Sequence, residues 1–176
     1  MSRIVEVRRH TDNDGDALTD EGVEDALALG AHLAEVSFAL VVSTGAQRAT
    51  QTAANILAGG GLQVAHGVVV EPGLRSGDED RWRAAYRTAG SGHLDQLRQA
   101  DPDFVVSEIQ VLSDALQRVA DRLAEGQRAL VIGHSPTSEA AIQGVTGATV
   151  DPISKGAGIV LTDEAGQWEV VTASMP

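Results

Sequence analysis

The segment Ile4-Val5-Glu6-Val7-Arg8-Arg9-His10-Thr11 opens with an apolar run and ends in basic and polar side chains. The run over residues 4–7 predicts a short buried strand, because branched apolar side chains favour strands. Arg9 and His10 follow this strand in a loop, and loops at strand ends are where proteins display reactive groups. An arginine can hold phosphate oxygens in bidentate fashion, and a histidine can attack phosphorus. The segment therefore predicts the first strand of the fold and a candidate phosphoryl-transfer site beside it.

Strands and helices alternate along the rest of the chain. Apolar runs indicate the strands, and apolar residues at helical spacing indicate the helices. We expect strands at residues 4–7, 39–42, 68–70, 129–132, 158–161 and 168–171, and helices at residues 19–35, 47–58, 107–123 and 136–145. This alternation predicts an α/β three-layer sandwich, in which helices flank a mostly parallel central sheet. Binding sites in such folds lie at the carboxyl ends of the strands.

Cap residues and local composition set the expected boundaries. Thr19 is expected to cap the first helix, and Ser107 with Gln110 has the pattern of a capping box at the start of the third. Residues 71–102 are charged and show only short helical pieces, so we expect a short insert or lid there. At 176 residues the chain has room for one sizeable core, so residues 1–176 are expected to form a single domain.

The composition argues against several classes of partner and site. Nucleic acids and anionic membranes bind basic surfaces, so a net charge of -12 makes neither an expected partner. Without cysteine, the chain forms no disulfide, no thiolate zinc site and no cysteine nucleophile. No apolar stretch approaches the roughly 20 residues of a membrane span, and the N-terminus lacks a signal-peptide pattern. A cytoplasmic protein is therefore expected, and its oligomeric state stays open.

Polar segments follow four of the predicted strands. They are residues 9–11, 43–48, 71–80 and 133–136. Because the carboxyl ends of parallel strands meet at one edge of a sheet, these segments are expected to lie close together. Arg9, His10, Arg48 and His134 would then supply a nucleophile and three partners for phosphate oxygens. The spacing of these segments predicts one shared anion site.

As a set, these segments resemble the motifs of the histidine phosphatase superfamily, also called the phosphoglycerate-mutase-like family. Its Arg-His-Gly is matched by Arg9-His10-Thr11, and its Leu-Thr-x-x-Gly by residues 18–22. Its Ser-x-x-x-Arg-x-x-Gln-Thr-Ala is approximated by residues 44–53, and its later Gly-His by Gly133-His134. The order and spacing agree over nearly the whole chain, so the resemblance implies a phosphoglycerate-mutase-like fold.

The resemblance also implies roles for individual residues. His10 would be the nucleophile that becomes phosphohistidine, and Arg9, Arg48 and His134 would line the phosphate pocket. In this chemistry a neutral imidazole attacks in line, fixed cations offset the charge on phosphate, and water then hydrolyses the phosphoenzyme. No metal or other cofactor is needed. Ser135, directly after His134, is expected to join the substrate-binding residues.

Two positions depart from the family pattern. Thr11 replaces the usual glycine, so its side chain is expected to fit beside the phosphate and to lend it a hydroxyl. Members that act on alkyl phosphates carry a glutamate in a Leu-x-Glu, where this chain has Ser76. Asp78, Glu79 and Asp80 lie close enough in sequence to act as the proton donor instead. We favour Glu79, because its longer side chain reaches further towards a leaving oxygen.

The predicted activity is that of a phosphoric monoester hydrolase acting on a phosphorylated small molecule or phosphoprotein. The short insert argues against a mutase, which has to retain and reorient its intermediate. An open site without an obvious acid suits a phosphohistidine substrate, because its nitrogen leaving group departs more readily than an alkoxide. Two alternatives stay open: a non-catalytic phosphate-binding regulatory module of the same fold, and a phosphoglycerate mutase.

Three further residue assignments can be tested against a structure. The acidic stretch over residues 12–16 is similar to a calcium loop, but its glycine is at the wrong position, so no metal site is expected. Arg8 points away from Arg9 by strand alternation, and we expect it to form an ion pair. His10 is expected to be an exposed loop residue that contributes little to stability.

Overall fold

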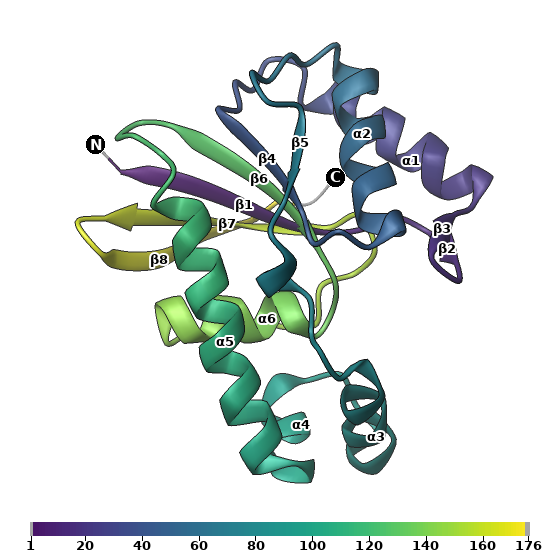
Figure 1. Ribbon diagram of the computed structural model, residues 1–176, viewed down its shortest axis with the longest axis vertical. Helices are drawn as coiled ribbons and strands as arrows, with labels where there is room; N and C mark the ends of the chain where they lie inside the picture. Colours follow the sequence, from purple (N-terminus) through teal and green to yellow (C-terminus); the bar gives the residue numbers. More distant parts are fainter. Residues whose placement is uncertain (1, 175–176) are drawn as a thin grey trace.

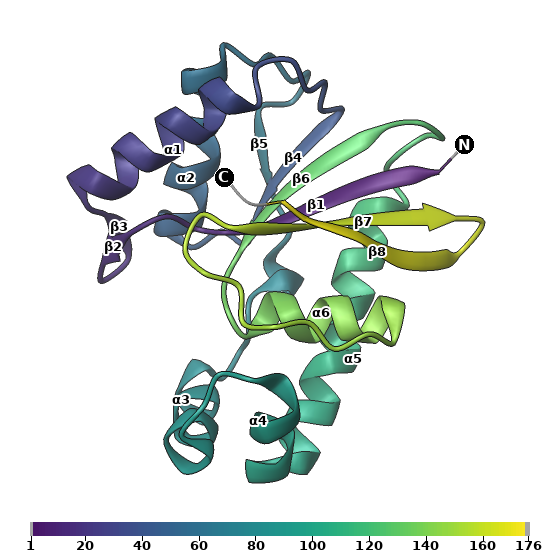
Figure 2. The same ribbon diagram turned by 180° about the vertical axis from the view of Figure 1, so that it is seen from behind.

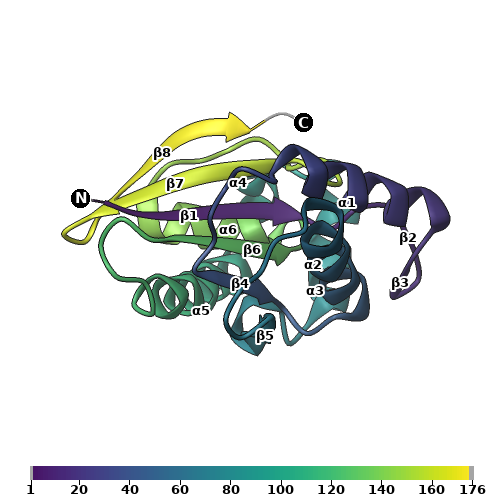
Figure 3. The same ribbon diagram turned by 90° about the horizontal axis from the view of Figure 1, so that it is seen from above.

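A six-stranded sheet forms the centre of the molecule, of which the computed structural model describes residues 2–174 (Figure 1). Its strands are β1 (Arg3–Arg9), β4 (Leu40–Ser43), β5 (Val68–Val70), β6 (Arg128–Gly133), β7 (Gly158–Glu164) and β8 (Gln167–Ser174). They lie in the order β5-β4-β6-β1-β7-β8, and Figure 3 shows β1, β6 and β7 side by side. The first four in this order are parallel, whereas β7 and β8 form an antiparallel hairpin at one edge. The predicted mostly parallel sheet is confirmed.

Helices cover both faces of this sheet (Figure 2). On one face lie α1 (Asp20–His32) and α2 (Gln47–Gly60), and on the other lie α5 (Pro102–Ala120) and α6 (Thr137–Thr146). Neighbouring residues of a strand point to opposite faces. Val41 therefore packs into the core beneath α1 and α2, and Val42 into the core beneath α5 and α6. The three predicted layers follow from this alternation.

Local hydrogen bonds shape the segment between β1 and α1. It forms a small hairpin of β2 (Asn13–Asp14) and β3 (Ala17–Leu18) before α1 begins. As predicted, Thr19 caps α1: its Oγ1 accepts a hydrogen bond from the backbone nitrogen of Gly22 at 3.0 Å. Arg8 makes the expected ion pair, with its Nε 2.5 Å from Glu6 Oε1.

The start of α5 differs from the prediction. The helix begins at Pro102, so Ser107 lies inside it and is no N-cap. Proline is favoured in the first turn of a helix because the amide hydrogen that it lacks would have no partner there. The added turns bury Phe104 and Val105 in the core. Tertiary burial of these two residues outweighs the capping pattern at Ser107.

The predicted insert over residues 71–102 is more regular than the sequence suggests. It forms the short 3-10 helix η1 (Pro72–Leu74) and the helices α3 (Glu79–Ala89) and α4 (Leu94–Ala100). Of these, α3 and α4 lie beside the N-terminal part of α5 (Figure 1). Trp82 packs edge-on against Phe104 at 5.2 Å between ring centroids. Leu94 and Leu97 are fully buried. Among residues 2–174, no helix is long and apolar enough to cross a lipid bilayer.

Candidate active site

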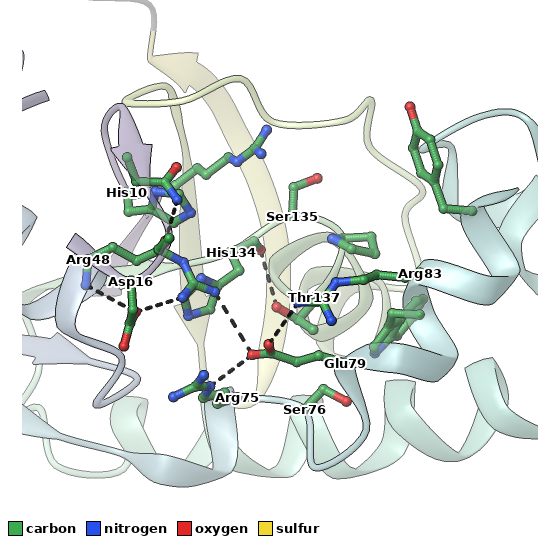
Figure 4. Close-up of a pocket in the computed structure, with 16 residues that line it drawn as sticks. His10, Asp16, Arg48, Arg75, Ser76, Glu79, Arg83, His134, Ser135 and Thr137 are labelled. Carbon is green, nitrogen blue, oxygen red and sulfur yellow. Dashed lines mark hydrogen bonds and ion pairs between the residues drawn. The ribbon is translucent and has the colours of Figure 1, made fainter. Parts of the chain in front are cut away.

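A cavity of about 560 Å³ opens where the carboxyl ends of β1 and β6 meet α2 and α3 (Figure 4). Its walls come from the loop after β1, the first turn of α2, residues 75–86 and the loop after β6. The charged or hydrogen-bonding side chains in these walls include Arg9, His10, Asp16, Arg48, Arg75, Ser76, Glu79, Arg83, Tyr86, His134 and Ser135. The structure thus brings together every predicted site residue except Thr11.

His10 is held in one tautomer by the backbone. Its Nδ1 lies 2.8 Å from the carbonyl oxygen of Thr11. A carbonyl oxygen only accepts, so Nδ1 carries the proton and Nε2 of the neutral ring keeps its lone pair. The pKa of His10 is lowered to about 4, chiefly by burial. The hydrogen bond to Thr11 raises this pKa, and the positive charges of Arg48 and Arg9 lower it further. The ring is therefore neutral and nucleophilic at neutral pH.

The predicted exposure of His10 is wrong, since only 4% of the residue is exposed. Its backbone nitrogen bonds the carbonyl of Gly133 at 3.0 Å, which ties the loop after β1 to the end of β6. The parallel pairing of the two strands continues to this point and draws His10 into the fold.

His134 lies next to His10, with 5.3 Å between ring centroids and 56° between ring planes. Its Nε2 is 2.8 Å from Oγ1 of Thr44, at the end of β4. Burial lowers the pKa of His134 to about 3, with further contributions from Arg48 and His10. The site thus contains two neutral imidazoles. Thr44, which orients one of them, stands where the family motif has serine.

Arg48 and Arg9 supply positive charge from two elements. Arg48 lies in the first turn of α2, and its Nη1 is 2.7 Å from Asp16 (Figure 4). Burial raises the pKa of Asp16, but the Gln47 amide and the Arg48 guanidinium outweigh this effect and lower it overall. Arg9 donates from Nη1 to the carbonyl of Ile153 at 3.1 Å. Burial lowers the pKa of Arg9.

Only one of the three acidic candidates of the insert lines this cavity. Asp78 caps α3, and its carboxylate accepts from the backbone nitrogen of Arg81 at 3.0 Å. Asp80 points into solvent, with 91% of its side chain exposed. Glu79 faces the cavity, with Oε1 2.9 Å from Nε of Arg75 and 3.9 Å from Nη2 of Arg48. The geometry therefore favours Glu79 over its two neighbours, as the sequence analysis did.

Thr11 is not placed where the sequence analysis expected it. Its hydroxyl donates to the carbonyl of Gly22 at 2.7 Å and lies 3.3 Å from the hydroxyl of Thr52. Because this hydroxyl is used within the fold, it is not aimed at a bound phosphate. Thr11 borders a second hollow beside α1 instead. The threonine is accommodated by hydrogen bonds to α1 and α2.

A buried glutamate that the sequence analysis missed stands behind Ser135. Oε1 of Glu139 accepts from the Ser135 hydroxyl at 2.5 Å and from the backbone nitrogen of Ile153 at 2.7 Å. Only 1% of Glu139 is exposed, and burial raises its pKa. A glutamate within a predicted helix normally lies in solvent, so the sequence carried no signal for this position.

The arrangement suits a tetrahedral dianion. Guanidinium groups and imidazole rings converge on one cavity, and the lone pair of His10 Nε2 is available for attack on an electrophile. Within residues 2–174, no group of three or more histidine, aspartate or glutamate side chains is placed to hold a metal ion. The chemistry that this geometry can perform is transfer of an anionic group to His10.

Comparison with known families gives a match over almost the whole length. The family model described as "Histidine phosphatase superfamily (branch 1)" matches residues 4–172. No curated protein matches the chain.

Solved structures share the fold at low sequence identity. A phosphoglycerate mutase from Bacillus anthracis str. Sterne has a TM-score of 0.70 at 19% identity, over 98% of this chain and 93% of that one. The protein histidine phosphatase SixA complexed with tungstate has a TM-score of 0.64 at 20% identity, over 96% and 94%. A putative alpha-ribazole-5'-P phosphatase from Escherichia coli str. K-12 substr. MG1655 has a TM-score of 0.61 at 20% identity, over 99% and 97%. At these identities the likeness shows the fold alone.

Proposed function

The chain belongs to the histidine phosphatase superfamily, and from this premise we propose that it is a phosphatase that works through a phosphohistidine on His10. One observation carries the proposal. The hydrogen bond from Nδ1 to the carbonyl of Thr11 leaves Nε2 unprotonated, inside a cavity that arginines line. A neutral imidazole with a free lone pair is the form that attacks phosphorus.

The proposed reaction has two steps. In the first, Nε2 of His10 bonds to phosphorus while the bond to the leaving group breaks, and the leaving group takes a proton. Arg9, Arg48 and His134 contact the phosphoryl oxygens and stabilise their charge in the transition state. In the second, water attacks the phosphohistidine and releases phosphate. The cationic side chains supply the charge stabilisation, so the proposed reaction needs no metal.

We propose a hydrolase rather than a mutase, acting on a phosphohistidine or a small phosphomonoester. The insert contributes the short elements η1, α3 and α4, and the cavity stays accessible beside them. Structures of similar fold include a protein histidine phosphatase, an alpha-ribazole phosphatase and a glucosyl-3-phosphoglycerate phosphatase as well as a mutase. They support a phosphorylated small molecule or phosphoprotein as the substrate class. The cytoplasmic location stays a prediction.

The proton donor of the first step is a separate question. Glu79 stays the donor that the sequence analysis predicts, and it lines the cavity. It is paired with Arg75 at 2.9 Å and with Arg83 at 3.6 Å. Guanidinium groups thus engage both carboxylate oxygens of Glu79.

The proposal is tested by phosphate release from 4-nitrophenyl phosphate and, in parallel, from a phosphohistidine peptide. We expect wild-type protein to release phosphate from at least one of them and His10→Asn to release none. Wild-type protein that binds phosphate near Arg48 but turns over neither compound would contradict the proposal and favour the non-catalytic binding module. Transfer of phosphate to an acceptor alcohol instead of water would favour a mutase.

A further inference from the structure

Ser135 and Glu139 form a connected pair that reaches from the cavity into the interior of the protein. Ser135 lines the cavity, and Glu139 lies behind it on the first turns of α6. The Ser135 hydroxyl and Oε1 of Glu139 are 2.5 Å apart, a short hydrogen bond between two oxygens. Among the described residues, Oε2 of Glu139 is buried and has no hydrogen-bond partner. Burying a charged carboxylate costs free energy when one of its oxygens has neither water nor a hydrogen-bond donor beside it.

The surroundings of Glu139 favour its protonated form. The groups that face it are Arg9 from β1, the Ser135 hydroxyl and the amide of Ile153 from the segment before β7. Arg9 acts on it at longer range, and no ion pair joins the two among the described residues. Burial is the largest influence on Glu139 and raises its pKa despite these neighbours. Burial and the unpartnered Oε2 therefore both favour a proton on Glu139.

We propose that Ser135 donates the proton to the leaving group and that Glu139 replaces it. This inference rests on the proposed phosphatase function. As Nε2 of His10 bonds to phosphorus, the phosphorus–oxygen bond breaks and its electron pair goes to the leaving oxygen. That oxygen takes the Ser135 hydroxyl proton, and Ser135 takes the proton of Glu139. In the structure the Ser135 hydroxyl donates to Oε1 of Glu139. For the transfer this bond runs the other way: a proton on Oε1 is donated to Oγ of Ser135, and the hydroxyl hydrogen faces the leaving oxygen.

The same neighbours stabilise the products of the step. Glu139 becomes a carboxylate, which the Ile153 amide and the nearby charge of Arg9 stabilise. Before the step, a bound phosphate dianion beside Arg9 would oppose a second negative charge and keep Glu139 protonated. The pair offers a proton source on a different wall from Ser76, the position where the family glutamate is missing.

Two variants remove the pair without removing the pocket. Glu139→Gln keeps an oxygen that can accept from Ser135 and Ile153, and places an amide where the unpartnered oxygen lies. Ser135→Ala removes the hydroxyl, and Ser135→Thr restores one. Glu108→Gln is a matched control, because this glutamate of α5 is also hydrogen-bonded but does not line the cavity.

The measurement is the single-turnover rate of leaving-group release from glycerol 3-phosphate and from 4-nitrophenyl phosphate. Alkoxides need protonation and nitrophenolate does not. We expect Glu139→Gln and Ser135→Ala to lose about 10²- to 10⁴-fold on the alkyl ester and less than about 10-fold on the aryl ester. Ser135→Thr should recover alkyl turnover, and Glu108→Gln should leave the ratio of the two rates unchanged. In wild type the alkyl rate should fall as pH rises and Glu139 ionises, and Glu139→Gln should lack this fall.

The outcomes separate this inference from the proposed function. Equal losses on both esters would show that Glu139 and Ser135 only support the fold, which overturns the inference and leaves the phosphatase intact. A selective loss of alkyl turnover in Glu79→Gln but not in Glu139→Gln would assign the donor to Glu79 and overturn the inference as well. Wild-type protein that cleaves neither ester nor a phosphohistidine peptide would contradict the proposed function itself.

Discussion

Two walls of the cavity differ in how they hold charge. The sheet wall includes Arg9, His10, His134 and Ser135, with Glu139 buried behind it, and its two histidines are 4% and 7% exposed. The insert wall consists of Arg75, Glu79, Arg83 and Tyr86, and Tyr86 is 54% exposed. On the sheet wall burial lowers the pKa of both imidazoles and raises the pKa of Glu139, whereas on the insert wall the charges face water and pair with one another. In the proposed mechanism the desolvated sheet wall carries out proton and phosphoryl transfer, and the insert wall contacts the substrate.

The largest effect should come from the nucleophile on the sheet wall. His10→Asn removes the atom that bonds to phosphorus, and we expect turnover of 4-nitrophenyl phosphate to fall by at least about 10⁴-fold. The free energy of unfolding should change by only about 0.5–3 kcal/mol, so the fold survives. Circular dichroism and thermal unfolding would confirm this. If the variant kept more than about a hundredth of the wild-type turnover, His10 would not be the nucleophile.

Arg48 lies between the two walls, because it pairs with Asp16 and approaches Glu79. Its replacement in Arg48→Gln should cost about 2 kcal/mol or more of transition-state stabilisation, since a charge-assisted contact to the transferring group is lost. The ratio kcat/KM on 4-nitrophenyl phosphate measures this loss. An unchanged ratio, with vanadate bound as tightly as in wild type, would place the phosphate site elsewhere.

The buried wall should also make stability depend on pH. An ordinary histidine in the unfolded chain has a pKa of about 6.5, whereas the pKa of His10 in the fold is about 4. Between these two pH values the unfolded chain binds a proton that the folded chain does not. The contribution of His10 to the free energy of unfolding is therefore complete above about pH 6.5 and is lost as the pH falls towards 4. We expect His10 to account for about 2 kcal/mol of this fall, a value reduced for screening by water in the cavity.

Urea unfolding at about pH 7.5 and about pH 4.5 would measure this dependence. His10→Asn should lose less stability than wild type between the two conditions, and its value at the higher pH provides the baseline. An equal loss in both proteins would show that burial does not hold His10 neutral.

The smallest effect should come from the insert wall. The side chain of Arg83 is 63% exposed and pairs with Asp80 and Glu79, so Arg83→Gln should change stability by less than about 1 kcal/mol. Its effect on kcat/KM for 4-nitrophenyl phosphate should also stay below about 1 kcal/mol, because the charge faces water. A loss as large as that of Arg48→Gln would mean that the two walls contribute equally.

The sequence predicted the sheet wall far better than the insert wall. Arg9 is the last residue of β1, and His10 and His134 directly follow β1 and β6, whose apolar runs are easily recognised. Parallel pairing of these two strands brings the three residues together. Residues 71–102 have weak apolar periodicity, so the helices α3 and α4 form through contacts such as Trp82 with Phe104 that only the folded chain makes. The start of α5 at Pro102 was missed for the same reason.

Two errors beside the sheet wall have a common cause. Thr11 was expected to face the phosphate, and its hydroxyl instead bonds Gly22 on α1. Glu139 was not predicted to lie near the site, because a glutamate within a helix normally lies in solvent. In the structure Glu139 is buried against the segment before β7. Both depend on contacts between segments far apart in the chain. Local patterns carry no information about them.

Trapping the phosphoenzyme tests the central claim most directly. Wild-type protein would be mixed with ³²P-labelled phosphohistidine peptide or aryl phosphate, quenched within the first turnover and digested, with His10→Asn treated in parallel. The account predicts acid-labile, alkali-stable label on the peptide that contains His10, and no label in the variant. Phosphate release without label on His10, or acid-stable label on a serine or threonine, would contradict it.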